Sequence, residues 1–194
     1  MREIGGCSVS EKPTVISAHG GYKSLKSFQM SEIVYDGTVK FCKRFIDQRS
    51  RTVDQMVQAA RSGRQNIAEG SMASGTSKKT ELKLVSVARA SLEELLLDYE
   101  DFLRQRDLHL WGKDDSRAVE IRELAGNTNR SYTTYRSYIE ERSAEIAANT
   151  MICLIHQTSY LLDQQLRQLD EAFLRQGGFT ERLYNARKNA RNQD

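Results

Sequence analysis

Proline is almost missing from this sequence. The only one among the 194 residues is Pro13, so every later position is free of it. Proline breaks helix interiors and marks the turns between strands. A β-rich chain with many tight turns would need more of it. Long helices joined by short loops are therefore the simplest interpretation.

Long apolar runs and cysteine are also scarce. No uninterrupted apolar segment approaches the roughly 18 residues that a membrane-spanning helix requires, so we expect no such helix. The first residues lack the apolar core of a secretion signal. Cys7, Cys42 and Cys153 are few, odd in number and far apart. They argue against a disulfide scaffold and favour the reducing cytoplasm.

Familiar catalytic and metal-binding motifs are missing too. The three histidines belong to no His-Glu-x-x-His or paired Glu-x-x-His pattern, and Gly-x-Ser-x-Gly and Gly-x-x-x-x-Gly-Lys-Ser/Thr are absent. Cys153 and His156 lie three residues apart on one helix face, but two ligands do not close a metal site. We interpret them as packing residues. The sequence thus predicts no catalytic residue, no metal site and no cofactor.

Apolar residues recur with a helical period in four long segments, at about 25–46, 52–71, 78–106 and 149–176. Thr76 or Ser77 is placed to cap the third segment, and Gly177 follows the fourth where a left-handed cap is expected. Gly37 weakens the first by about 1 kcal/mol relative to alanine. The predicted fold class is all-α, an antiparallel up-down four-helix bundle with a helical insertion before the last helix.

The remaining segments frame this bundle. We assign residues 23–177 to the bundle, residues 1–22 to a flexible N-terminal arm and residues 178–194 to a basic C-terminal tail. Residues 113–147 are charge-dense, with apolar residues scattered among the charges. We expect this insertion to form one or two helices that contribute little to the core.

The second predicted helix has a second seam opposite its core stripe. Its small and polar members are spaced 4, 3, 4, 3, and they are Gln55, Ala59, Ser62, Asn66 and Glu69. Alanine and serine allow helices to approach closely. This seam is a solvated face, or else a contact between subunits or the lining of a polar lumen. We assign it as the candidate oligomer interface.

Charge is unevenly distributed along the chain. From Lys40 to Arg89 the net charge is +7, and from Glu93 to Glu123 it is −5. The candidate nucleic-acid-binding residues are Lys40, Lys43, Arg44, Arg61, Arg64, Lys78, Lys79, Lys83 and Arg89. Cations in such a group attract phosphate backbones. Pairing with the acidic segment of a neighbouring subunit and simple surface solvation are the alternatives.

One stretch is more specific than the rest. It reads Gln-Ala-Ala-Arg-Ser-Gly-Arg-Gln-Asn-Ile-Ala-Glu-Gly-Ser over residues 58–71, and Ser-Lys-Lys-Thr-Glu (77–81) and Val-Ala-Arg-Ala-Ser-Leu-Glu-Glu-Leu (87–95) follow it. Together these resemble a bacterial four-helix-bundle family. Its founding members are encoded by intervening sequences in 23S ribosomal RNA genes, and the accessory variability proteins of diversity-generating retroelements look like relatives.

The resemblance implies a ring-shaped homopentamer that binds nucleic acid and a reverse transcriptase through basic surfaces. It covers about residues 25–106, and the last helix by pattern only. Two features depart from the family. Gly63 stands where a larger aliphatic residue is usual, and residues 113–147 lengthen a connection that many members keep short. The chain is most similar to a longer subgroup, the four-helix-bundle suffix-domain proteins.

The leading prediction is a non-enzymatic, oligomeric nucleic-acid-binding adaptor in the cytoplasm, associated with ribosomal RNA or a reverse transcriptase. RNA and DNA both remain open as its ligand. A protein-binding scaffold that docks through residues 113–147, with no nucleic-acid role, is the first alternative. A small enzyme or metal protein is the second.

Overall fold

Only helices and their connections occur over the residues that the computed structural model describes, which are 20–126 and 130–192. The elements are η1 (Tyr22–Ser24, a 3₁₀ turn), α1 (Lys26–Phe45), α2 (Arg51–Ala73), α3 (Lys78–Arg104), α4 (Ser116–Leu124), α5 (Tyr132–Glu140), α6 (Ala144–Gln176) and α7 (Phe179–Arg191). This confirms the all-α prediction. The first three long helices begin and end within two residues of their predicted bounds.

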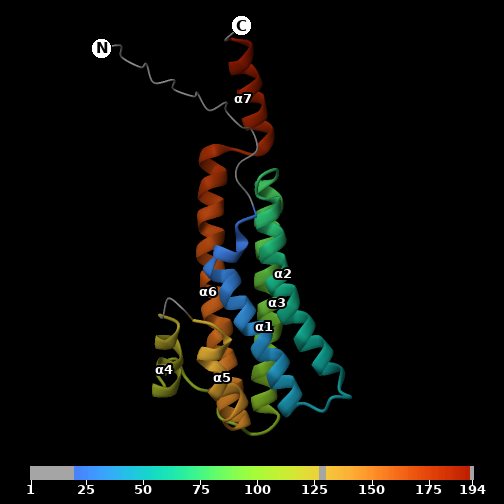
Figure 1. Cartoon of the computed structure of the whole chain (residues 1–194), viewed down its shortest axis with the longest axis vertical. Coiled ribbons are helices and arrows are strands. Elements are labelled where there is room, and N and C mark those ends of the chain that lie inside the picture. The colour runs from blue at the N-terminus through green and yellow to red at the C-terminus, as the bar shows by residue number, and fades with distance from the viewer. Residues whose placement is uncertain (1–19, 127–129, 193–194) are drawn as a thin grey trace, which may run out of the picture.

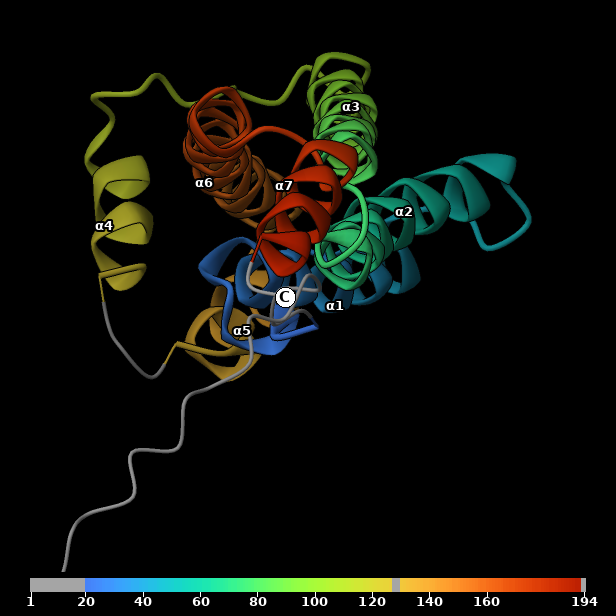
Figure 2. The same ribbon diagram turned by 90° about the horizontal axis from the view of Figure 1, so that it is seen from above.

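The four longest helices run along the long axis of the molecule (Figure 1). Each packs against two of the others, in the order α1, α2, α3, α6 and back to α1. Seen from above, α2 diverges from the remaining three toward its N-terminus (Figure 2). The turn at residues 74–77 between α2 and α3 lies near one end of these four helices, which we call the α2–α3 end.

Serine side chains cap the N-termini of α2, α3 and α6. The backbone N–H of Thr52 donates to the Ser50 hydroxyl, and that of Thr80 donates to the Ser77 hydroxyl at 3.1 Å. Such caps satisfy N–H groups that have no partner within the helix. Of the two predicted caps of α3, the structure selects Ser77. The Ser77 cap therefore fixes the point at which the turn ends and α3 begins.

An aromatic cluster fills the centre of the core. The Phe41 ring lies 4.8 Å from both the Tyr99 ring and the Phe102 ring, edge to face in each case. The buried Tyr99 hydroxyl donates to the Thr38 hydroxyl at 3.1 Å. This hydrogen bond satisfies the buried phenol without water. It also joins α1 to α3 across the core.

The insertion was expected to contribute little to the core, and this expectation is wrong. Its helix α4 packs on α6, and α5 packs on both α1 and α6. Ala118, Ile121, Tyr135 and Ile139 are all at most 2% exposed. One or two buried side chains per turn are enough to pack so short a helix against the body of the protein, even in a charge-rich segment. The predicted boundary at residue 147 lies inside α6, which begins at residue 144.

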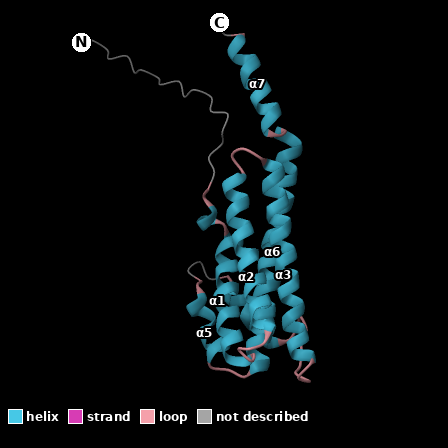
Figure 3. Ribbon diagram, turned by 90° about the vertical axis from the view of Figure 1, so that its right-hand side faces the viewer, coloured by secondary structure: helices cyan, strands magenta, loops and turns pink. Residues whose placement is uncertain are grey.

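The two ends of the chain also differ from expectation. The predicted arm, residues 1–22, lies outside the described residues except for its last three. Of these, Gly20 donates its N–H to the Ser71 carbonyl, and the Tyr22 ring lies 4.8 Å from the Phe28 ring. The predicted basic tail is largely a helix, α7, which extends past the α2–α3 end (Figure 3).

Candidate nucleic-acid interface

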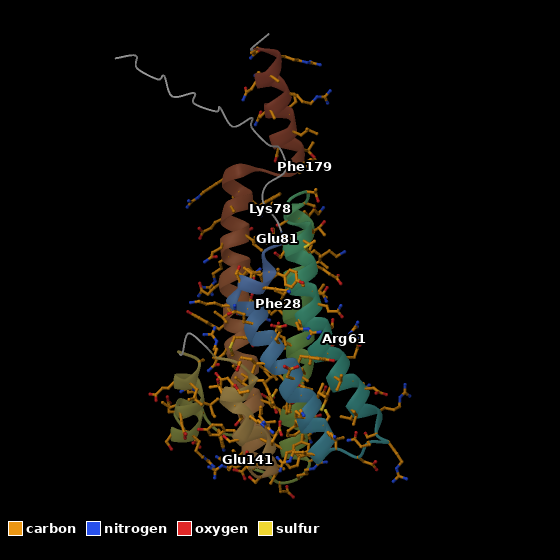
Figure 4. All side chains as sticks on the ribbon, in the orientation of Figure 1. Phe28, Arg61, Lys78, Glu81, Glu141 and Phe179 are labelled. Carbon is orange, nitrogen blue, oxygen red and sulfur yellow. The ribbon has the colours of Figure 1, made fainter. Side chains whose placement is uncertain are left out.

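The nine predicted nucleic-acid-binding residues do not form one patch. Lys40, Lys43 and Arg44 lie near the end of α1, and Lys78, Lys79 and Lys83 lie in the first two turns of α3. Figure 4 shows that Lys78 lies close to the α2–α3 end, while Arg61 lies lower on α2. An α-helix rises 1.5 Å per residue, so the set spans roughly 30 Å of the long axis.

Two of the arginines hold helices together. Arg44 donates from Nη1 to the Ile139 carbonyl at 2.6 Å and reaches the Arg142 carbonyl at 3.3 Å. It therefore supplies partners to carbonyl groups at the end of α5, which have none within the helix. Arg64 lies over the Tyr35 ring at 4.4 Å, a cation–π contact between α2 and α1.

Two further cations are paired with carboxylates. Lys78 Nζ lies 2.9 Å from Glu81 Oε2, and Arg89 Nε lies 2.6 Å from Asp163 Oδ1. Glu81 is only 6% exposed, so Lys78 is the counterion of a buried charge. Removing one partner of such a pair is costly. Lys78 is thus poorly suited to a phosphate contact and to a test by substitution.

Five of the nine cations remain exposed and belong to no ion pair within the described ranges. They are Lys40, Lys43, Arg61, Lys79 and Lys83. Lys79 and Lys83 are four residues apart, hence one turn apart on the same side of α3. Of these five exposed cations, Lys79 and Lys83 are the two that lie at the α2–α3 end.

Helix α7 adds further positive charge beside that end. Its 13 residues include four basic residues and one acidic residue, and Arg187, Lys188 and Arg191 are exposed. Gly177 turns the chain between α6 and α7 with a φ of +67°, the sign that the predicted cap requires, but its ψ of −177° lies outside the left-handed helical region. The sequence predicts a tail here because this segment lacks a long apolar stripe. Glu181, whose carboxylate accepts from the Gly178 N–H, was the signal for a helix start.

Part of the predicted oligomer interface lines a groove of about 690 Å³ between α2 and α3. Gln55, Ala59 and Ser62 form its α2 wall, and the facing wall includes Ser91. The Ser62 and Ser91 hydroxyls lie 2.9 Å apart, so the floor is a direct contact between small side chains. The hollow follows from that small size, because larger residues would fill it.

The other two members of the seam lie elsewhere. Asn66 donates its amide N–H to the Ser62 carbonyl at 2.9 Å, one turn back along α2. Glu69 is exposed. Neither lines the groove. The structure therefore brings together only the first three seam residues.

The groove is acidic. Asp54, Glu94 and Asp98 line it, against one cation, Arg51. Partial burial raises the pKa of Asp98, and the neighbouring charges of Asp101 and Glu94 raise it further. Three carboxylates around one hollow attract cations and repel phosphate. The groove is consequently suited to a basic protein surface.

The predicted packing role of Cys153 agrees with its surroundings. Burial raises the pKa of its thiol to about 11, although Arg122 opposes this shift. Burial likewise raises the pKa of Cys42 to about 12. Cys153 is buried, but His156 is exposed, so the prediction that His156 is a packing residue is wrong. No cluster of three or more His, Cys, Asp and Glu side chains suited to a metal ion occurs in the part of the chain that the structure describes.

Comparisons with protein-family models, with curated proteins and with solved structures found no match. Within residues 20–126 and 130–192, none of the helices combines the length and the apolar character needed to cross a membrane.

Proposed function

We propose that the protein is a non-enzymatic, homo-oligomeric adaptor that binds nucleic acid in the cytoplasm. Its body would be an antiparallel four-helix bundle of α1, α2, α3 and α6, with α4 and α5 as a packed insertion. The family resemblance supports a pentamer that associates with ribosomal RNA or a reverse transcriptase.

The observation that carries this proposal is the basic character of the α2–α3 end. Exposed Lys79 and Lys83 lie there, and α7 begins beside them and carries three exposed cations, Arg187, Lys188 and Arg191, in its second half, farther from the bundle. Glu81, the nearest acid on α3, is already paired with Lys78. Cations without partners next to one another favour contact with a polyanion.

The kind of recognition follows from the residue types. Lysine is a flexible point charge that contacts phosphate without reading base edges. We therefore expect affinity that depends on salt far more than on sequence. The remaining exposed cations, Lys40, Lys43 and Arg61, would extend the path along α1 and α2.

The proposed assembly uses the acidic groove. In a ring, a groove that carries Asp54, Glu94 and Asp98 would face basic side chains of the adjacent copy. The chain itself carries both a basic segment and an acidic segment, so one copy could supply the cations and the next copy the carboxylates. This arrangement supports the subunit-contact interpretation of Gln55, Ala59 and Ser62.

The test is a binding titration with a labelled single-stranded RNA and the DNA of the same sequence, followed by fluorescence anisotropy. Lys79→Gln combined with Lys83→Gln should weaken binding at least tenfold and leave helix content unchanged. The control, Lys113→Gln combined with Arg136→Gln, removes two exposed cations from the insertion, one of which, Arg136, is paired with Glu140, and should change affinity less than twofold. Equal affinities for both double variants would contradict the proposal.

A protein-binding scaffold is the second candidate, and one observation favours it. Helix α7 packs extensively on no other described element, and Leu174 and Tyr184 near it are 75% and 66% exposed. Exposed apolar side chains on an unpacked helix suit a protein partner. If the RNA and DNA titrations show no binding at low salt, this candidate replaces the first.

A further inference from the structure

A second hollow, distinct from the acidic groove, is built by the insertion. It has a volume of about 500 Å³ and lies where α1, α6 and the segment after α4 meet. Cavities of about 300–1,000 Å³ are typical of small-molecule sites. The body of the protein alone would lack this hollow, because Arg122, Ala125 and Arg130 of the insertion form one of its walls.

The charge of this hollow has one sign. Lys26, Arg122 and Arg130 line it, and no carboxylate does. No ion pair within the described part of the chain involves Lys26 or Arg122. Cations that surround a hollow with low-dielectric walls concentrate a positive potential inside it. An anion is therefore the favoured occupant.

Both guanidinium groups are held in place. Arg130 donates from Nη1 to the Ala125 carbonyl at 2.9 Å and from Nε to the Met30 sulfur at 3.0 Å. Arg122 donates to the Lys113 carbonyl. A guanidinium fixed by the protein loses less conformational entropy when it binds an oxyanion.

The floor and one wall are apolar. Met30 is 1% exposed, and Leu161 is packed against the core. Tyr160 lies at the rim with 62% of its surface exposed. The hollow therefore offers surface for an apolar body as well as charge for a head group.

A buried amide completes the lining. Both Nε2 and Oε1 of Gln157 are inaccessible to solvent and have no hydrogen-bond partner among the residues that the structure describes. Buried polar atoms without partners are rare and costly. Gln157 lines the same hollow as the three cations, and a rotation of its side chain toward the hollow would bring the amide N–H within reach of a bound oxyanion.

From these features we infer that the insertion builds a binding site for a small organic anion, with a carboxylate or phosphate head on an apolar body. The head would lie against Lys26, Arg122 and Arg130, and the body against Tyr160 and Leu161. This site is independent of the proposed nucleic-acid contact, because none of its lining residues belongs to the α2–α3 end or to α7.

Isothermal titration calorimetry of the full chain tests the inference with simple probes. Decanoate supplies both head and body, and it should bind with one site per chain. Inorganic phosphate, which lacks the body, should bind at least tenfold more weakly. Decyltrimethylammonium has a similar body and the opposite charge, and it should not bind at the same site.

Variants locate the site. Lys26→Glu should weaken decanoate binding at least tenfold, whereas Lys40→Glu, an exposed lysine on the same helix, should change it less than twofold. Gln157→Leu keeps the size of the side chain and should weaken binding about threefold or more. The inference is overturned if decanoate does not bind at millimolar concentration, if decyltrimethylammonium competes equally, or if Lys26→Glu and Gln157→Leu both bind as the unmodified chain does.

Discussion

Gly37 shows how a single residue sets the distance between helices. The sequence marked it as a weak point of α1, and the structure explains its presence. A Cβ atom built there would lie 2.6 Å from the Met151 sulfur and 3.2 Å from Ile139 Cδ1. Both of these side chains are fully buried. Gly37 is thus a close-approach position at which α1 meets both α5 and α6.

Gly37→Val should therefore destabilise the protein. Overpacking a full core costs typically 1–3 kcal/mol, and the β-branched side chain gains little helix propensity over glycine. Gly112→Val is the matched control, because a Cβ there meets nothing within 4 Å. Urea unfolding followed by circular dichroism measures both. Equal stability of the two variants would show that the Met151 side chain moves aside with no loss in the free energy of unfolding.

The two buried thiols give a residue-scale prediction about pH. Their pKa values, about 12 for Cys42 and about 11 for Cys153, lie above the ordinary value of 9.0. Above pH 9 the unfolded chain releases these protons while the native protein keeps them. The thiols therefore favour folding fully below pH 9, and the free energy of unfolding falls as pH rises from 9 toward 11–12.

The measurement is thiol labelling of a Cys7→Ser variant, together with urea unfolding at pH 8 and pH 10. Cys42 and Cys153 should react at least a hundredfold faster in urea than in the native protein. Cys42→Ala should lower overall stability but reduce the loss between pH 8 and pH 10. Rapid labelling of the native protein at pH 8 would show that the thiols are accessible.

At the scale of elements, the sequence predicts what depends on local chemistry. The bounds of α1, α2 and α3, the cap at Ser77 and the positive φ at Gly177 follow from periodicity and capping residues. The role of the insertion does not, because burial of Tyr135 and Ile139 depends on where α5 docks. The start of α6 was placed too late, since its Ser143 cap lies among charged residues. The hollow beside the insertion is lined by three segments that are far apart in the sequence, and no sequence pattern predicts it.

Ile139→Ala tests whether the insertion belongs to the core. Truncation of a fully buried isoleucine costs about 2–5 kcal/mol, and Ile139 is 0% exposed. Arg136→Ala, one turn earlier on the exposed side of α5, should change stability by less than about 0.5 kcal/mol. Equal unfolding midpoints would show that α5 docks only loosely.

The whole molecule separates its charges by location. The α2–α3 end and α7 are basic, and the groove between α2 and α3 is acidic. The sequence predicted the uneven charge but could not tell which cations are already paired. Four of the nine predicted phosphate-binding cations have partners inside the protein, and they are Arg44, Arg64, Lys78 and Arg89. The sequence does not show the contacts of the three arginines because their partners lie far away along the chain, and it does not show that Glu81, the partner of Lys78, is buried. What remains is a shorter basic surface than nine residues suggested.

The proposed homo-oligomer depends on contacts made by the acidic groove. Glu94→Arg reverses a charge in its lining, so it should lower the oligomer mass in light scattering at micromolar concentration. Glu93→Arg changes the adjacent exposed residue, which does not line the groove, and should leave the mass unchanged. A monomer in the unmodified protein would contradict the proposed assembly outright.

The most direct test of nucleic-acid binding is the salt dependence of affinity. Log affinity for single-stranded RNA should fall linearly with log salt, with a slope of about −0.7 for each phosphate neutralised. Replacing Lys79 and Lys83 together with glutamine should make the slope shallower by about one to two units. The Lys113→Gln, Arg136→Gln control should keep the original slope. A slope near zero in the unmodified protein, or the same slope in both double variants, would contradict a phosphate-binding surface at the α2–α3 end.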